Sequence, residues 1–161
     1  MGALVRMIWL RKYTAKLAYE PLVDGKPPVG GPPLPASLAE PVPAHWAHAD
    51  GEFVMLWALH VTHPSHDMFV APGATLDDGL LHIYLVRSSC KPASLLGLFL
   101  KIETGQHVGH PDLEVIRTRA FRLVPDERAT TRGIFMVDGE KAGPGALQHA
   151  VRPKAGRALV L

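Results

Sequence analysis

The sequence predicts one mainly β domain, an antiparallel β-sandwich or curled sheet with one inserted amphipathic helix and a short helix at its amino terminus. Short apolar segments rich in strand-forming residues recur along the chain between turn-forming residues. In the middle of the chain the apolar spacing changes from a period of two to a helical period. With 47% hydrophobic and 20% charged residues, the 161-residue chain has the size and composition of one folded domain.

The first residues predict a short amphipathic helix. Its apolar residues stand at helical spacing: Leu4, Val5, Ile8 and Trp9. The apolar run from residue 1 to residue 10 is too short to span a bilayer, and its charges do not fit a secretory signal. Residue 6 is Arg rather than Ser or Thr, so the myristoylation pattern is not met either.

A strand and a proline-rich segment follow. Residues 13–19 alternate apolar and other side chains and predict a strand. Residues 21–45 are rich in proline and glycine and show no periodic pattern, which excludes a helix or an inner strand. We expect a flexible surface insertion there, with the ordered body beginning near Trp46.

Two strands and a helix make up the first half of the body. Residues 53–61 are apolar apart from His60, as expected of a strand covered on both faces. The turn at residues 77–79 precedes a strand at residues 80–86, whose side chains alternate between two apolar faces. Pro92 near the start and Gly105 past the end bound a helix of about three turns. Its apolar face is formed by Leu95, Leu98, Phe99 and Ile102.

The second half reads as further strands. They are expected at residues 115–123, 133–137, 147–151 and 158–161. Residues 125–132 join two of them in hairpin fashion.

Composition and missing motifs exclude several function classes. The net charge of +2 shows no broad basic field, so we expect no nucleic-acid partner. The single cysteine, Cys90, cannot form an intramolecular disulfide, suits a reducing cytoplasm and is best interpreted as a structural residue. The sequence contains no phosphate-binding P-loop, dinucleotide-binding, zinc-protease or nucleophile-elbow motif.

The histidines invite a metal hypothesis. His60, His63 and His66 are three residues apart and Asp67 follows, a spacing that would cluster them on a helix. Pro64 interrupts this segment at the end of a strand, so exposed loop histidines are the favoured interpretation and no metal site is predicted. His82 is expected to be a satisfied core histidine, whereas His107, past the helix, could serve a ligand.

The sharpest local motif is GIFMVDGE at residues 133–140. A strand ends there in Asp138-Gly139, which supports a tight turn because glycine tolerates positive φ. The turn presents the carboxylates of Asp138 and Glu140 at its tip. On the motif alone, a plain hairpin turn is the simpler interpretation.

Several blocks, in order, resemble the carboxy-terminal portion of the sphingosine kinases, within the diacylglycerol-kinase-like lipid kinases. They are KLAY (16–19), EPVPAHW (40–46), FVMLWAL (53–59), DMFVAP (67–72), DDGLLH (77–82), YLVR (84–87), LLGLFL (95–100), GQH (105–107), AFRLVP (120–125) and GIFMVDGE (133–140). The amino-terminal helix matches as well, so the resemblance covers nearly the whole chain except the proline-rich insertion. The order and spacing of the blocks make it specific.

The resemblance implies a fold of two domains, an α/β nucleotide-binding domain followed by a β-sandwich that holds the lipid. It implies transfer of the γ-phosphate of ATP, with Mg²⁺, to the primary hydroxyl of sphingosine or a related long-chain base. The glycine-rich nucleotide loop and the catalytic aspartate of such kinases lie upstream of every block matched here. We therefore expect residues 1–161 to be the lipid-binding domain without its nucleotide-binding partner, as a fragment, a partial gene model or a truncated isoform, and expect no catalytic residue in it.

The resemblance also assigns residues to roles. Asp138, Gly139 and Glu140 match the terminal nucleotide-contact motif. The positions that match the lipid pocket are Met55, Trp57, Pro64, Tyr84, Val86, Leu95, Leu98, Phe99, Ile102, His107 and Met136. Trp57 and Met136 are larger than the family's usual residues, and Pro64 replaces an aliphatic residue, so the pocket length is expected to differ.

Two other hypotheses remain open at this stage. The chain can be a non-catalytic β-domain that binds lipid or membranes, or an unrelated β-sandwich that binds a protein partner. The cations beside Leu4 and Val5 suit a peripheral membrane surface or a calmodulin-like groove, while packing against another domain would explain the same face. The resemblance implies a cytoplasmic, peripherally membrane-associated protein.

Overall fold

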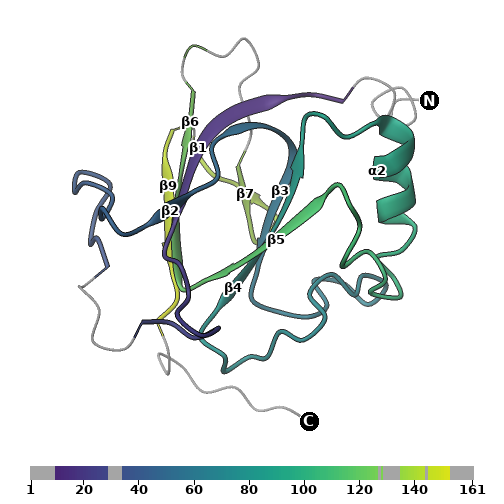
Figure 1. Ribbon diagram of the computed structural model, residues 1–161, viewed down its shortest axis with the longest axis horizontal. Helices are drawn as coiled ribbons and strands as arrows, with labels where there is room; N and C mark the ends of the chain where they lie inside the picture. The colour runs from purple at the N-terminus through teal and green to yellow at the C-terminus, as the bar shows by residue number, and fades with distance from the viewer. Residues whose placement is uncertain (1–9, 29–33, 127, 129–134, 144, 153–161) are drawn as a thin grey trace.

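The computed structural model describes residues 10–28, 34–126, 128, 135–143 and 145–152. In this part of the chain one helix, α2 (Pro92–Phe99), is inserted among strands. The strands are β1 (Tyr13–Tyr19), β2 (Ala47–His48), β3 (Gly51–Leu59), β4 (Leu81–Arg87), β5 (Leu113–Thr118), β6 (Ala120–Pro125), β7 (Met136–Val137), β8 (Glu140–Lys141) and β9 (Leu147–Ala150). Figure 1 shows α2 beside the β3–β4–β5 part of the sheet.

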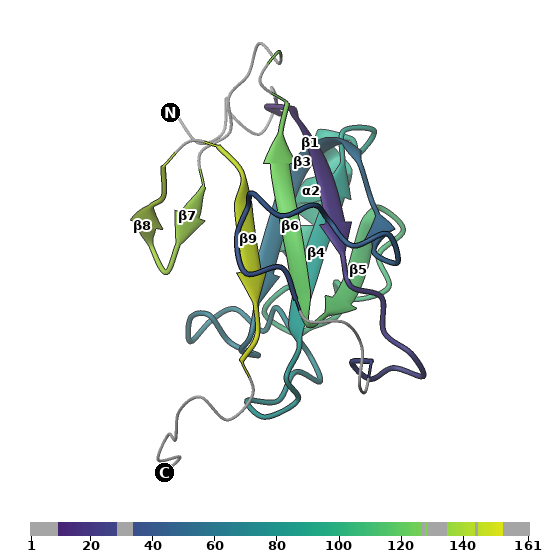
Figure 2. The ribbon, with the colours of Figure 1, turned by 90° about the vertical axis from the view of Figure 1, so that its left-hand side faces the viewer.

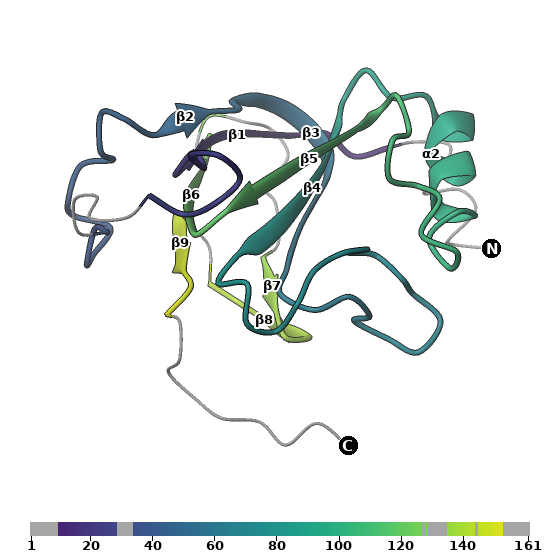
Figure 3. The same cartoon turned by 60° about the horizontal axis from the view of Figure 1, so that its bottom comes forward.

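Seven of these strands form one antiparallel sheet in the order β5-β4-β3-β1-β6-β9, with β2 paired to β1. The sheet is strongly curved, so β1, β6 and β9 turn away from β3, β4 and β5 (Figures 2 and 3). Strands β7 and β8 form a separate two-stranded hairpin. The mainly β, antiparallel class with one inserted helix is therefore confirmed.

Strand β4 is buried on both of its faces. Leu81, Ile83 and Leu85 are fully buried on one face, and Tyr84 and Val86 are buried on the other. This is the alternation that the sequence predicts for a strand between two apolar layers. The two layers are two separate hydrophobic clusters.

The inner cluster fills the concave side of the curved sheet. It joins Leu81, Ile83 and Leu85 of β4 to Leu17 of β1 and Phe121 of β6. These strands lie at different places along the sheet, so the curvature lets the sheet pack against itself in the manner of a sandwich. The strand expected at residues 13–19 lies in the middle of this sheet, and the ordered body therefore begins well before Trp46.

The outer cluster lies between the sheet and α2. Tyr84 and Val86 of β4 contact Leu95 and Leu98 of the helix there. Pro92 stands in the first turn of α2, where its missing N–H leaves no hydrogen bond unmade.

The helix is shorter than the sequence predicts. It ends at Phe99 after eight residues, about two turns rather than three. Beyond it the chain tightens into turns in which the Ile102 N–H donates to the Phe99 carbonyl at 3.1 Å. At Gly105 (φ +71°) any Cβ would lie only 2.8 Å from the Phe69 ring, so this close turn requires glycine. No helix in the described part of the chain has the length and apolar character needed to cross a membrane.

Strand β3 is less buried than its continuous apolar run predicts. Of its nine residues only Phe53 is fully shielded, and most of the others are half-buried. The register with β4 shifts between Phe53 and Met55, and β3 pairs with β1 only over residues 13–15 of β1. The outer half of β3 therefore lacks a second neighbouring strand. Because most side chains of β3 are only half-buried, the prediction of a strand covered on both faces is wrong.

The single strand expected at residues 115–123 is two strands. Strand β5 ends at Thr118 and β6 begins at Ala120, with Arg119 between them. The expected hairpin through residues 125–132 is also wrong, because β6 pairs with β1 and β9 while β7 pairs with β8.

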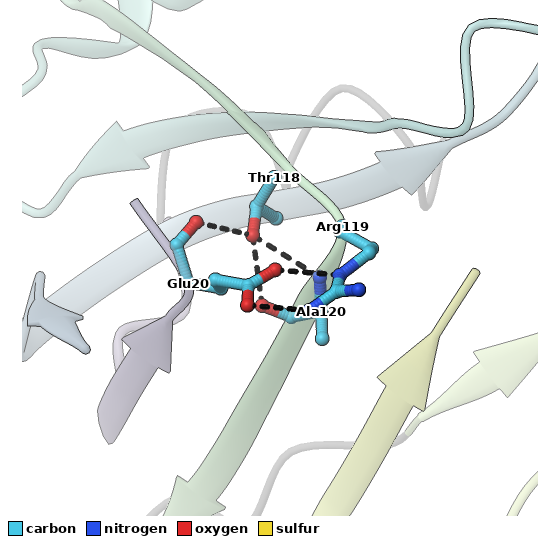
Figure 4. A network of polar contacts seen from close by, with 4 residues as sticks. All are labelled: Glu20, Thr118, Arg119 and Ala120. Atoms are coloured by element: carbon cyan, nitrogen blue, oxygen red, sulfur yellow. Dashed lines mark hydrogen bonds and ion pairs between the residues drawn. The ribbon is translucent and has the colours of Figure 1, made fainter. Parts of the chain in front are cut away.

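A buried ion pair holds the break between β5 and β6. Glu20 is fully buried, and Arg119 donates two hydrogen bonds to its carboxylate, at 2.8 and 2.7 Å (Figure 4). The Thr118 hydroxyl lies 2.8 Å from the carbonyl oxygens of Glu20 and Ala120 and accepts a bond from the Ala120 N–H. These contacts satisfy the polar groups that a continuous strand would have paired.

The proline-rich insertion is anchored to the sheet at its second end. No helix or named strand lies within residues 21–28 and 34–45. Arg122 of β6 donates to the carbonyls of Glu40 and Ser37, and Gln148 of β9 donates to that of Pro35. The helix expected over the first residues and the strand expected at residues 158–161 lie outside the described residues.

We expect the substitution Arg119→Met to lower the free energy of unfolding by about 3 kcal/mol, because it leaves the Glu20 carboxylate buried without its partner. Urea unfolding monitored by circular dichroism measures the change. Glu114→Gln is the matched control: it disrupts the exposed Arg87–Glu114 pair and should cost less than about 1 kcal/mol. Equal effects of the two substitutions would contradict a special role for the buried pair.

Candidate functional site

The face of the sheet that carries α2 brings together most of the residues expected to hold a lipid. We call this set the α2 cluster. It consists of Tyr84, Val86, Leu95, Leu98 and Ile102, which are buried, with Met55 and Trp57 packed against them. Alternation along β3 and β4 points Met55, Trp57, Tyr84 and Val86 to the same face, because Met55 pairs with Val86 and Trp57 with Tyr84.

Phe99 and Trp57 form the exposed rim of the α2 cluster. Their rings meet edge to face with centroids 5.9 Å apart. Phe99 is 36% exposed, and Trp57 is half-buried. Phe99 thus lies at the boundary between the packed side chains and solvent, where an apolar ligand could extend the cluster.

His107 lies beneath this face and is almost wholly buried. Its Nε2 lies 2.8 Å from the Val70 carbonyl, and its ring is 5.8 Å from the Tyr84 ring. Its Nδ1 is buried and has no hydrogen-bond partner. Burial raises the pKa of Tyr84 to about 12, so that phenol stays neutral. The neutral hydroxyl group of Tyr84 therefore lies inside a mostly apolar site.

Two of the expected lipid residues lie outside the α2 cluster. Pro64 is exposed in the loop between β3 and β4, and Met136 is 59% exposed on β7. The described structure does not bring either of them to the buried part of the cluster.

The expected nucleotide-contact residues form the tip of the β7–β8 hairpin. Asp138 (φ 49°) and Gly139 (φ 84°) both have left-handed backbones, as in a type I′ turn. Glu140 follows in β8, and both carboxylates are exposed. A shallow recess beside the turn is lined by Val137, Asp138, Glu140, Lys141 and Ala142. Oxygen ligands of this kind fit Mg²⁺, and an ammonium group at Lys141 fits phosphate.

Other buried residues complete the α2 cluster. They are Val70, Ala71, Ala74, Cys90 and Leu113. The apolar residues of the DMFVAP block could have indicated from the sequence that Val70 and Ala71 are buried. Burial raises the pKa of the Cys90 thiol, so the interpretation of Cys90 as a structural residue agrees with its environment.

The three histidines at residues 60, 63 and 66 do not converge. His63 stacks on Phe69, and His66 lies nearest to Asp67. In the part of the chain that the structure describes, no group of three histidine, cysteine or carboxylate side chains is placed to hold a metal ion. The imidazole of His82 is buried within 3.3 Å of the Asp78 carboxylate, as expected of a satisfied core histidine.

Comparison with known proteins assigns the chain to a family. Residues 45–160 match the model of the YegS C-terminal NAD kinase beta sandwich-like domain. The chain belongs to this family. The match covers strands β2 to β9 together with α2, and so includes the whole α2 cluster.

Relatives with a known activity are sphingosine kinases. This member of the family is 42% identical over 133 residues to sphingosine kinase 2 of Homo sapiens, covering 80% of this chain and 20% of that one. It is 37% identical over 166 residues to human sphingosine kinase 1, covering 95% of this chain and 42% of that one. The chain thus spans less than half the length of these relatives. The resemblance to the sphingosine kinases is confirmed, and the chain is related to a lipid kinase family.

One solved structure, of a putative diacylglycerol kinase from Bacillus anthracis str. Sterne, covers 93% of this chain with 16% identity. The chain spans 43% of that protein, with a TM-score of 0.49.

The α2 cluster predicts different costs for two neighbouring truncations. Leu98→Ala removes a fully buried side chain and should lower the free energy of unfolding by about 2–5 kcal/mol. Phe99→Ala removes a rim side chain and should cost about 1–2 kcal/mol. Both place alanine in the same turn of α2, so helix propensity contributes little to the difference. Urea unfolding measures both, and a larger loss for Phe99→Ala would place it in the core instead of at the rim.

Proposed function

We propose that this domain is the lipid-holding part of a sphingosine kinase, which transfers the γ-phosphate of ATP to the primary hydroxyl of sphingosine. The kinship with sphingosine kinases supports the reaction class. The observation that carries the proposal for this chain is the half-exposed Trp57–Phe99 pair at the rim of an otherwise buried apolar cluster.

The chemistry of a long-chain base fits such a rim. Its alkyl tail gains about 0.8 kcal/mol for each methylene removed from water, so a few contacts with Trp57, Phe99 and Met55 give useful affinity. The polar end of the base carries hydroxyl and amino groups, which need hydrogen-bonding partners when they leave water. His107 has one unpaired ring nitrogen beneath the cluster and is our candidate for such a contact.

The β7–β8 hairpin is our proposed nucleotide contact. Asp138 and Glu140 are exposed carboxylates on a rigid two-residue turn, and in the complete enzyme they would face ATP and Mg²⁺. Phosphoryl transfer depends on positioning and on neutralising the charge of the phosphates. The hairpin supplies one edge of such a site, and the glycine-rich loop of such kinases has no counterpart in these 161 residues.

A non-catalytic role is the second candidate. Leu96 and Leu100 are exposed on the outer side of α2, and Leu100 is the most exposed large apolar residue of this helix region. An exposed apolar helix face suits a lipid surface. We therefore propose peripheral membrane association in the cytoplasm as well. The membrane or calmodulin-like contact expected at Leu4 and Val5 lies outside the described residues.

The proposal predicts that Phe99→Ala weakens sphingosine binding about tenfold without unfolding the protein. The reason is the loss of several apolar contacts to the tail at the rim. Equilibrium binding of radiolabelled sphingosine to the 161-residue chain in mixed micelles measures this. Leu76→Ala is the control, since this leucine is exposed in the loop between β3 and β4 and lies outside the α2 cluster. Equal affinity of the Phe99 variant and the unmodified chain would contradict a lipid site at this rim.

The isolated 161-residue chain should not phosphorylate sphingosine. Only the hairpin edge of the nucleotide site is present in it, and each missing positioning or acid–base element is worth orders of magnitude in rate. Incubation with labelled ATP, Mg²⁺ and sphingosine measures the activity. Turnover by the purified chain that disappears in the Glu140→Gln variant would show that the chain is a complete catalyst.

A further inference from the structure

Two histidines from distant parts of the chain meet at the open mouth of the inner cluster. The Nε2 atoms of His60 and His149 are 3.0 Å apart, although the residues are 89 positions apart in sequence. Their ring centroids are 5.0 Å apart. His60 follows the end of β3, and His149 lies on β9; these two strands are not neighbours in the sheet.

Sheet geometry explains why the two rings point at each other. On β9, His149 shares a face with Leu147, which packs on the inner cluster, and it pairs with Phe121 of β6. On the β3 side, His60 continues the inward-facing series of Leu56 and Ala58. The curvature of the sheet brings these two rows together at its open end.

We propose that His60 and His149 form a binding site for a transition-metal ion of the zinc class. Zinc binds imidazole nitrogens at about 2.0–2.1 Å, and tetrahedral geometry then places two such nitrogens about 3.3 Å apart. The observed separation of 3.0 Å is close to that value. The two Nε2 atoms face each other as a hydrogen-bonded pair, and imidazole nitrogens brought together in this way are donors that zinc, copper and nickel ions prefer once the shared proton is displaced.

Asp138 of the hairpin turn lies near enough to His149 to act on it electrostatically. His60 is exposed and His149 is half-buried, so an ion can reach the pair from solvent. No third described side chain completes the set, which leaves the remaining coordination positions to water.

Such an ion would stabilise the folded domain by cross-linking two of its strands. It would tie the end of β3 to β9 across the mouth of the inner cluster, joining strands that share no backbone hydrogen bonds. It would also place a divalent charge on the Asp138 side of that mouth, next to the hairpin that we propose contacts the nucleotide. Binding itself does not depend on the proposed kinase function.

Zinc titration of the tag-free chain tests the proposal. We expect calorimetry to show one saturable zinc site and thermal unfolding to show a Tm that rises with zinc until saturation, because the ion binds only the folded arrangement. MgCl₂ should give neither signal, since Mg²⁺ prefers oxygen ligands. His60→Asn and His149→Asn should each abolish both signals.

His66→Asn is the matched control, because His66 is a highly exposed loop histidine that lies apart from the pair. It should leave the zinc-dependent rise in Tm intact. Absence of any zinc-dependent rise in the unmodified chain, or its survival in both pair variants, would overturn the proposal. Loss of the rise in His66→Asn alone would assign the metal to the loop and overturn it equally. If His149→Asn unfolds, His60→Asn decides the outcome, since His60 is exposed and belongs to neither hydrophobic cluster.

Discussion

Strand β4 is the element on which both halves of this domain depend, because it is buried on both faces. Leu81, Ile83 and Leu85 fill the concave side of the curved sheet, and Tyr84 and Val86 support α2 on the other side. A strand with one exposed face could not contribute buried side chains to two hydrophobic clusters at once. The curvature that closes the inner cluster and the platform that carries α2 therefore have the same structural origin.

This arrangement separates the interactions that stabilise the fold from the proposed binding of a lipid. The inner cluster is packed between strands from distant parts of the sheet, whereas the α2 cluster ends in a half-exposed rim at Trp57 and Phe99. A ligand that enlarges the outer cluster need not disturb the inner one. The buried Glu20–Arg119 pair acts elsewhere: it holds the turn between β5 and β6 in place, so that β5 can pair with β4 and β6 with β1.

Local chemistry was enough to predict the strands with clear alternation and the Asp138-Gly139 turn. In both cases the determining interactions lie within a few residues in sequence. The split at Arg119 could not be predicted in this way, because its partner Glu20 lies 99 residues away. The close approach of Gly105 to the Phe69 ring and the meeting of His60 with His149 likewise join residues that are far apart in the sequence. The lipid and nucleotide roles came from a resemblance to a family. The structure adds the distinction between the buried cluster, its rim, and the exposed positions Pro64 and Met136.

We propose that a long-chain base contacts the α2 side of β4 and not the concave side. Photo-crosslinking with a sphingosine analogue that carries a diazirine in its tail tests this most directly, with the labelled residues located by peptide mass spectrometry. We predict labels on Met55, Trp57 and Phe99, competed away by unlabelled sphingosine. Competable labels confined to concave-side residues such as Leu56, Ala58 or Leu147 would contradict it.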